Sequence, residues 1–474
     1  MRDLTGFQET RLKILTIRPN HKIHWLTYAL SVHVSGNPEG AVGILDSYID
    51  TLDKDNAVEF TKCFESSELA MYKNLCLSET SNGGGDEKGD DDDSPNEDGL
   101  GGIRIALQHL DKIRPIVVDE TGWLMSKLSY QLQLGQFDEA KDTVQLLFDR
   151  GSTEDHVVHS AYMCALLKSS RDEWLEVSKL RGTSTLATYR VLTDEERSVL
   201  LTAYGGDGDG TAAASDTNTG LLLTYPRSPS IKRIHLTLLP TTSEQYKSAI
   251  NQYCQRQIIK GVPSLGSDLS SMYLMMEEVE PNGKTRYTLA KDPVDVKSHS
   301  TYRLLVNLVD SYITSLSESN TFPNTNDSTE DVQPSALLWT WYLRSILHEQ
   351  VGEYAQGITL INKCIEHTPT AVDFYELKAR LLECGGDIQQ AATIVDAGRD
   401  LDHQDRYINN QTTKTLLRAG REDEALQRIS MFTREGGPAE QNLYDMQCTW
   451  YELELADCLR KKGELGKSLR KYSK

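Results

Sequence analysis

Long apolar runs, paired cysteines and proline are all scarce in this chain of 474 residues. No apolar run approaches the ~18 residues that a membrane-spanning helix needs, so we expect a chain that does not enter a membrane. The eight cysteines are scattered without a C-x-x-C pair, which argues against a disulfide framework and against a zinc site. The first residues lack the apolar core of a secretory signal and the acid-poor character of a transit peptide, and we therefore expect a cytoplasmic protein.

An excess of positive charge is absent as well. The formal net charge is −20, and an acidic chain is a poor general binder of nucleic acid. The charge is uneven, because residues 86–98 carry eight acids and one lysine, whereas residues 460–474 carry seven basic residues and one acid. We expect an acidic loop, a basic end and no direct sequence-specific contact with nucleic acid.

Alternating β-branched runs are rare, and helical periodicity dominates instead. Apolar residues recur at intervals of three and four in residues 336–350 and 358–367, which is typical of amphipathic helices. Residues 234–240 are the one segment that also fits a strand or an extended linker. The sequence therefore predicts an all-α fold.

A glycine followed five positions later by a small residue recurs along the chain. Gly352, Gly386 and Gly420 are 34 residues apart, and an aromatic residue stands eleven positions before the first two, at Trp341 and Tyr375. This period and these offsets are the signature of the tetratricopeptide repeat, in which the glycine ends helix A of a helical hairpin and the small residue lets helix B approach it. We predict a right-handed superhelix of stacked helical hairpins. Further matches begin at Gly36, Gly135 and Gly463.

Three polar segments interrupt the repeats. Residues 81–102 are acidic, residues 205–220 are rich in Gly and Asp, and residues 317–334 are polar, so we expect disordered loops there. The predicted organisation is helical repeats at 1–80, 103–204 and 221–316, with strict 34-residue repeats at 335–474. The repeat register places both chain ends inside a repeat, and we expect the sequence to be a fragment that starts and stops mid-repeat.

Motifs for catalysis are incomplete. His348 and Glu349 begin an H-E-x-x-H pattern, but Gly352 stands where the second histidine ligand would be. The stretch 463–468 resembles a phosphate-binding loop, yet Lys461 stands at the position of its first glycine. We therefore expect no catalytic residues, no metal site and no cofactor of the chain's own.

The remaining candidate is the concave wall that helices A would line. Alternating aromatic and charged groups suit a folded protein or a helix as partner. A register shift of one residue would move Trp339 and Tyr342 into the core, and for these two that alternative stays open. The predicted partner contacts are Trp339, Tyr342, Glu349, Glu376, Arg380, Tyr407 and Trp450.

A basic set lies near the end of the chain. Lys414, Arg418 and Arg421 follow one another at i, i+4 and i+7, which predicts one helix face without an acid. Converging Arg and Lys side chains can hold a multiply phosphorylated ligand by charge-assisted hydrogen bonds, and a solvated basic face is the alternative. The predicted polyphosphate set is Lys414, Arg418, Arg421, Arg428, Arg434, Lys461 and Lys462.

Several stretches resemble one family. Five of them are similar to the auxiliary, ribosome-anchoring subunit of the N-terminal acetyltransferase A complex: RDLTGFQETRLKILTIRPN, KGVPSL, DRYINN, FTREG and YDMQCTWYELELADCLRKKGELGKSLRKY. The resemblance runs through residues 2–80 and 225–474, weakens in 103–225, and covers a central part of such subunits.

The resemblance implies a non-catalytic scaffold. Such a subunit wraps a small GNAT-type acetyltransferase, adjusts its site toward small N-terminal residues and docks it on the ribosome for co-translational acetylation. It also implies inositol hexakisphosphate as a glue, held by Lys414, Arg418, Arg434 and Lys462 first, with Arg421 in a more variable position. The alternative is a generic repeat adaptor, for which the repeated Lys/Asn/Arg carboxylate clamp is missing.

Overall fold

The computed structural model describes most of the chain. The described residues are 3–52, 62–80, 99–180, 182, 184–205, 220–279, 285–290, 292–323, 333–434 and 437–473, with the backbone alone for 275–279 and 285–289. The chain divides into two compact units, Met1–Leu238 and Leu239–Lys474.

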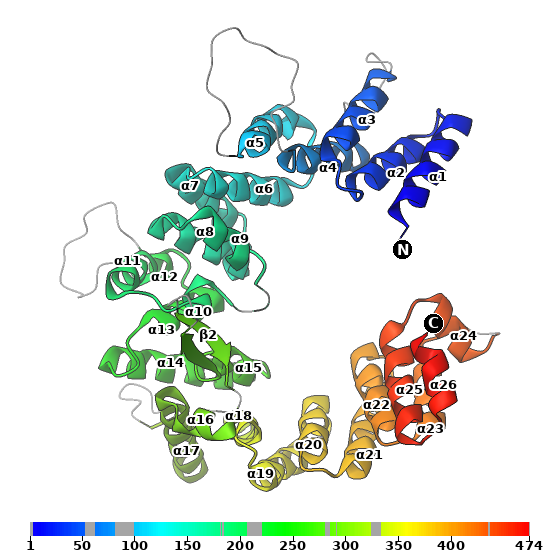
Figure 1. Ribbon diagram of the computed structural model, residues 1–474. Helices are drawn as coiled ribbons and strands as arrows, with labels where there is room; N and C mark the ends of the chain where they lie inside the picture. The colour runs from blue at the N-terminus through cyan, green and yellow to red at the C-terminus, as the bar shows by residue number, and fades with distance from the viewer. Residues whose placement is uncertain are drawn as a thin grey trace. The chain divides into compact units, whose positions relative to one another are not determined.

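The N-terminal unit is a series of helices in which chain neighbours pack together, as α2 does with α3 and α6 with α7 (Figure 1). Its largest core cluster buries Trp123, Phe148 and Tyr204. The elements are α1 (Leu4–Ile17), α2 (Lys22–His33), α3 (Pro38–Asp50), α4 (Phe64–Ser78), α5 (Gly101–Ile113), the 3-10 turn η2 (Arg114–Ile116), α6 (Glu120–Gln133), α7 (Phe137–Asp149), the 3-10 turn η3 (Ser152–Glu154), α8 (His156–Leu167), α9 (Arg171–Val177), α10 (Leu186–Tyr189), α11 (Asp194–Gly205), α12 (Leu221–Thr224) and α13 (Pro229–Leu238).

The C-terminal unit holds the repeats of strict period. Pairs such as α18 with α19 and α20 with α21 form the hairpins that the sequence predicts (Figure 1). The elements are α14 (Glu244–Lys260), α15 (Leu265–Ser270), β1 (Met275–Val279), β2 (Thr285–Leu289), α16 (Pro293–Ser298), α17 (Ser300–Ser319), α18 (Ser335–Gln350), α19 (Tyr354–His367), α20 (Val372–Cys384), α21 (Ile388–Arg399), α22 (Arg406–Arg418), α23 (Glu422–Ser430), α24 (Ala439–Asp445), α25 (Thr449–Lys461) and α26 (Leu465–Tyr472).

The turn between helix A and helix B has one geometry throughout. After α18, Gly352 takes a φ of 75°, and the Glu353 N–H donates to the His348 carbonyl at 3.0 Å, which satisfies a carbonyl at the helix end. Glycine adopts this left-handed conformation without the steric cost that a Cβ atom brings. The predicted turns are confirmed, because the other repeat glycines also have positive φ: Gly36, Gly135, Gly386, Gly420 and Gly463.

The small residue on helix B is also confirmed. A Cβ atom built on Gly357 would lie 3.0 Å from Leu381 Cδ2 and 3.4 Å from the Ser345 carbonyl oxygen, so a larger residue would push neighbouring helices apart. The equivalent small residues of the other repeats are buried: Ala41, Ala140, Ala391, Ala425 and Ser468.

In two repeats the side chain eleven residues before the turn glycine anchors the start of helix A. Trp25 Nε1 donates to the Pro19 carbonyl at 2.7 Å, and the Tyr375 hydroxyl donates to the Pro369 carbonyl at 2.9 Å. Asn409 stands at the same repeat position of α22, where its buried amide nitrogen and oxygen find no hydrogen-bond partner among the described residues. This anchor is therefore absent from α22.

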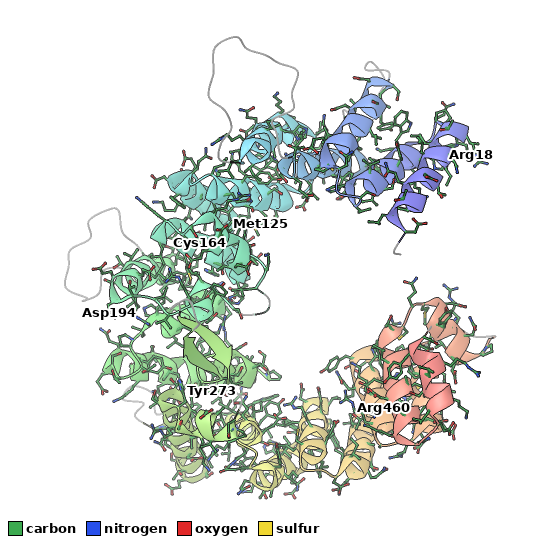
Figure 2. All side chains as sticks on the ribbon, viewed as in Figure 1. Arg18, Met125, Cys164, Asp194, Tyr273 and Arg460 are labelled. Carbon is green, nitrogen blue, oxygen red and sulfur yellow. The ribbon has the colours of Figure 1, made fainter. Side chains whose placement is uncertain are left out.

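A β-hairpin is the main departure from the predicted fold. β1 and β2 pair antiparallel with Met275 opposite Leu289, just after the buried Tyr273 that Figure 2 labels. This hairpin was not predicted because MMEEV lacks period-two alternation, although Asn282-Gly283 is a strong hairpin-turn signal. The strand alternative at 234–240 is wrong, since α13 continues to Leu238.

The predicted loops fall mainly outside the described residues. Of the three segments, residues 81–98, 206–219 and 324–332 are not described. At the described margins the loops are shorter than expected, because α5 begins at Gly101 and α17 continues to Ser319.

Candidate functional site

Trp339 and Tyr342 on α18 pack with the core of their repeat. Both ring centroids lie 5.5 Å from that of Phe374, and burial raises the pKa of Tyr342 well above its ordinary value. The chain segment before α15 covers Trp339, since a Cβ atom built on Gly261 would lie 2.5 Å from Trp339 Nε1. The structure therefore favours the core alternative that the sequence left open for these two residues.

Polar side chains one repeat apart join neighbouring A helices. Glu349 on α18 accepts two hydrogen bonds from Arg380 on α20, at 2.5 Å from Nε and 2.9 Å from Nη2. Tyr407 on α22 donates its hydroxyl to Glu376 Oε1 on α20 at 2.7 Å. A partner that docks here would meet paired groups and not free charges.

Arg418 links three A helices. Its Nη2 donates to Glu454 Oε1 on α25 at 2.9 Å, and its Nη1 donates to Glu383 Oε1 on α20 at 3.2 Å. The hydrogen bond to Glu454 is the largest cause of a raised pKa at the guanidinium, and the charges of both carboxylates add to it. Because the side chain is 41% exposed, these pairs contribute only ~0–1 kcal/mol each and weaken with salt.

Lys414 and Trp450 make a different contact between α22 and α25. Lys414 Nζ lies 5.1 Å from the centre of a Trp450 ring, and such a cation–π interaction contributes ~0.5–1 kcal/mol when it is solvent-accessible. Tyr407, on the same helix as Lys414, is 54% exposed. Lys414 and Trp450 are half-buried, and Trp450 packs against the core cluster of the last repeats. We call these three side chains the accessible aromatic patch, after the exposed ring of Tyr407.

Arg421 does not share a helix face with Lys414. α22 ends at Arg418, and Arg421 is the N-cap residue of α23. Its Nη2 pairs with Glu424 Oε2 of α23 at 2.6 Å, and this hydrogen bond is the largest cause of a raised pKa at the guanidinium. The prediction that Lys414, Arg418 and Arg421 lie on one helix face is therefore wrong.

The expectation that no acid faces the basic set is wrong too. Arg428 on α23 donates from Nη2 to Asp396 Oδ2 on α21 at 2.8 Å and from Nε to Oδ1 at 2.9 Å. Lys462 Nζ lies 2.9 Å from Glu422 Oε2, which brings it beside the turn between α22 and α23. Sequence spacing on one helix could not reveal acids that neighbouring helices supply.

Arg434 and Lys461 differ from the rest of the set. Both are exposed, and neither forms an ion pair with a residue that the structure describes. Arg460, beside Lys461 and labelled in Figure 2, instead pairs with Asp457 of its own helix at 3.1 Å. The seven predicted residues are thus spread over α22, α23, α25 and the segments that follow them.

The carboxylates that neutralise these cations were not predicted from the sequence. A usable signal was the repeat length itself, because paired charges are 31 residues apart for Arg380 and Glu349, 35 for Arg418 and Glu383, and 36 for Arg418 and Glu454. Opposite charges about one repeat apart on A helices therefore predict cross-helix pairs.

Membrane and metal chemistry find no support in the described part of the chain. None of its helices combines the length and apolar character needed to cross a bilayer. Its His, Cys, Asp and Glu side chains form no group of three or more that could hold a metal ion. The cysteines are free thiols, and burial raises the pKa of Cys164 on α8 to about 12 (Figure 2).

Comparison with known proteins identifies the family. The model of the N-terminal acetyltransferase A auxiliary subunit family matches residues 98–287 and 296–474. The chain belongs to this family. The resemblance inferred from the sequence is confirmed, and the stretch 103–225, where it was expected to weaken, lies inside the first match.

Members of the family from a plant and an animal align along the chain. It is 30% identical over 474 residues to the N-terminal acetyltransferase A complex auxiliary subunit NAA15 of Arabidopsis thaliana, and 25% identical over 472 residues to the N-alpha-acetyltransferase 16, NatA auxiliary subunit, of Homo sapiens. The alignments take in 100% and 99% of this chain but 44% of each relative. The chain therefore spans less than half the length of these curated family members.

A solved structure has a similar fold. The structure of Naa15/Naa10 bound to HypK-THB matches with a TM-score of 0.64 and 24% identity, and the match covers 100% of this chain and 57% of that chain. This likeness supports the all-α repeat fold.

Proposed function

We propose that the chain is a scaffold portion of a non-catalytic auxiliary subunit, which holds a GNAT-type acetyltransferase subunit for N-terminal acetylation of proteins. The observation that carries this proposal is membership of the auxiliary subunit family over most of the chain. Stacked hairpins suit the role, because each repeat adds surface beside the last and a partner can contact many repeats at once.

The contact surface that the geometry favours is the accessible aromatic patch of Tyr407, Lys414 and Trp450. Aromatic anchors carry much of the binding energy at protein interfaces. The Tyr407 ring is exposed, and the half-buried Trp450 ring is held by its core contacts and by Lys414. Glu349 and Arg380 would add to the complementarity of the interface more than to its binding energy, because their charges already pair with each other.

Co-expression with the catalytic subunit tests this proposal. We expect Tyr407→Ala combined with Trp450→Ala to reduce the amount of acetyltransferase that copurifies with the chain. Gln390→Ala is the matched control, because Gln390 is exposed on the helix B α21. Failure of the unaltered chain to retain any acetyltransferase would contradict the scaffold role, whereas equal capture by all three proteins would contradict only the assigned surface.

The same proposal extends to the ribosome, to the cytoplasm and to a polyphosphate. As in the family, the assembled subunit would anchor the enzyme to ribosomes in the cytoplasm and favour small N-terminal residues. Inositol hexakisphosphate would bind as a structural ligand at the basic set around Lys414 and Arg418. Arg434 and Lys461, which are exposed and pair with no carboxylate that the structure describes, support this site, although the ligand must compete with Glu383 and Glu454 for Arg418.

Calorimetric titration with inositol hexakisphosphate tests the polyphosphate site. Lys414→Glu with Arg418→Glu should weaken binding, and Glu454→Gln should strengthen it, because it removes a competing carboxylate from Arg418. Arg460→Glu controls for overall charge, since Arg460 pairs within its own helix. An affinity that all three variants leave unchanged would contradict the assignment.

A further inference from the structure

A surface pocket of the N-terminal unit lies outside everything that the proposed function uses. Its volume is about 410 Å³, within the range of ~300–1,000 Å³ that is typical of ligand sites. One wall is the turn η3, and the other is the segment between α12 and α13. The lining residues are Thr153, Glu154, Thr224, Tyr225, Pro226, Arg227 and Ser228.

The floor of this pocket is fixed by buried hydrogen bonds. Ser228 Oγ donates to the Thr153 carbonyl at 3.2 Å and accepts the Ile231 N–H at 3.2 Å. His159 Nε2 donates to the same carbonyl at 2.9 Å, while its Nδ1 lies 2.9 Å from the Tyr204 hydroxyl that donates to it. Burial lowers the pKa of His159, so the ring is neutral and holds this arrangement. The floor is therefore preorganised.

Polar groups of the pocket walls already form hydrogen bonds with other residues of the chain. The Tyr225 hydroxyl donates to Asp149 Oδ1 at 2.6 Å and accepts from Gln145 Nε2 at 2.7 Å, so the pocket meets mainly its ring. Glu154 Oε2 accepts the Ser230 N–H at the start of α13 at 3.1 Å. These bonds leave few groups with capacity for a ligand.

Two lining groups keep that capacity. Arg227 is exposed and forms no hydrogen bond or ion pair with a residue that the structure describes, so its guanidinium offers up to five N–H donors. Glu154 Oε1 has only a long contact of 3.4 Å with Thr153 Oγ1. The pocket thus presents one free cation and one half-used carboxylate on a fixed floor.

This pairing selects among anionic ligands. A polyphosphate would gain from Arg227 but would be repelled by the Glu154 carboxylate. A peptide carries both a side-chain carboxylate for Arg227 and backbone N–H groups for Glu154. Its chain can also lie against the Tyr225 ring and Pro226.

We propose that this pocket binds an acidic linear peptide of a partner protein. An Asp or Glu carboxylate of the peptide takes two hydrogen bonds from Arg227, and a neighbouring backbone N–H donates to Glu154. The pocket shares no residue with the accessible aromatic patch, because all of its lining residues belong to the N-terminal unit.

An array of random nine-residue peptides, probed with the full chain, tests this inference. We expect enrichment of Asp or Glu at one position for the unaltered chain and for Arg171→Gln, an exposed arginine of α9 without a described ion pair. Arg227→Gln should abolish the enrichment and weaken the best acidic peptide by about tenfold, because a bidentate charge-assisted pair is lost. No acidic enrichment, or enrichment that Arg227→Gln leaves intact, would overturn the proposal.

Glu154→Gln tests whether the Glu154 carboxylate faces the bound peptide, and displacement by inorganic phosphate tests for a simple anion site. The glutamine oxygen can still accept the Ser230 N–H, while the negative charge is gone. We expect a phosphoserine version of the best peptide to bind the Glu154→Gln variant better than it binds the unaltered chain. Displacement of the acidic peptide from the unaltered chain by inorganic phosphate would instead identify a simple anion site and contradict the peptide assignment.

Discussion

The turn after α20 allows a direct test of the repeat geometry. Gly386 has a φ of 95°, and no neighbouring atom lies within 4 Å of a Cβ atom built on it, so alanine changes only the backbone energy. A left-handed alanine costs ~1–2 kcal/mol, and its stiffer unfolded chain returns ~0.4–1 kcal/mol. We expect Gly386→Ala to lower the free energy of unfolding of the C-terminal unit by about 1 kcal/mol.

Thermal and denaturant unfolding of the full chain, followed by circular dichroism, measure this change. A loss of 1 kcal/mol shifts Tm by ~2–4 °C for a unit of this size. Gly386→Asn should lose less than Gly386→Ala, because asparagine tolerates the left-handed conformation. Gly466→Ala is the matched control: it lies in α26 with equally open space around its Cβ position, and it should gain up to ~1 kcal/mol.

The order of stability among these variants tests whether the positive φ explains the repeated glycine. If Gly386→Ala is as stable as the unaltered chain, or if Gly386→Asn is no better than Gly386→Ala, the positive φ does not explain the repeated glycine. A destabilised Gly466→Ala would show that added bulk, and not backbone conformation, governs both sites.

Three further predictions concern polar groups. Arg418→Gln should lose ~0–1 kcal/mol of stability at low salt, and the difference should vanish at high salt because salt screens exposed ion pairs. Denaturant unfolding at two ionic strengths measures this. An effect that persists at high salt would contradict the interpretation of these contacts as screened ion pairs. Asn409→Leu should gain ~1–3 kcal/mol, because its buried amide atoms lack described partners; a lower Tm would mean that the amide is bonded. Burial lowers the pKa of His156 and of His109 to about 4, so the neutral rings stabilise the fold fully above their ordinary value of about 6.5, and this stability is lost as the pH falls from there toward 4; an unfolding midpoint that is flat across this window would contradict it.

Local chemistry explains what the sequence predicted well. The turn at Gly352 follows from the conformation that glycine alone adopts cheaply, and the small residue at Gly357 follows from the close approach of two helices. Both requirements belong to one hairpin. They could therefore be read from residues only a few positions apart.

Contacts between hairpins explain which features the sequence predicted poorly. Trp339 could belong to the wall or to the core, and the choice depended on the segment around Gly261, almost eighty residues earlier in the chain. The face around Arg418 was expected to be free of acids, yet Glu383 and Glu454 reach it from the helices on either side. Spacing along one helix contains no information about such neighbours.

The sequence by itself determined the helical repeats, their turns and the family, because these depend on period, backbone conformation and short characteristic stretches within the chain. Only the tertiary structure decided which charges stay free. Stacking brings side chains from separate repeats within hydrogen-bond reach, and each cation then pairs with whichever carboxylate its neighbours supply. In this chain that left Arg227 exposed above a fixed pocket while Arg418 was neutralised from two sides.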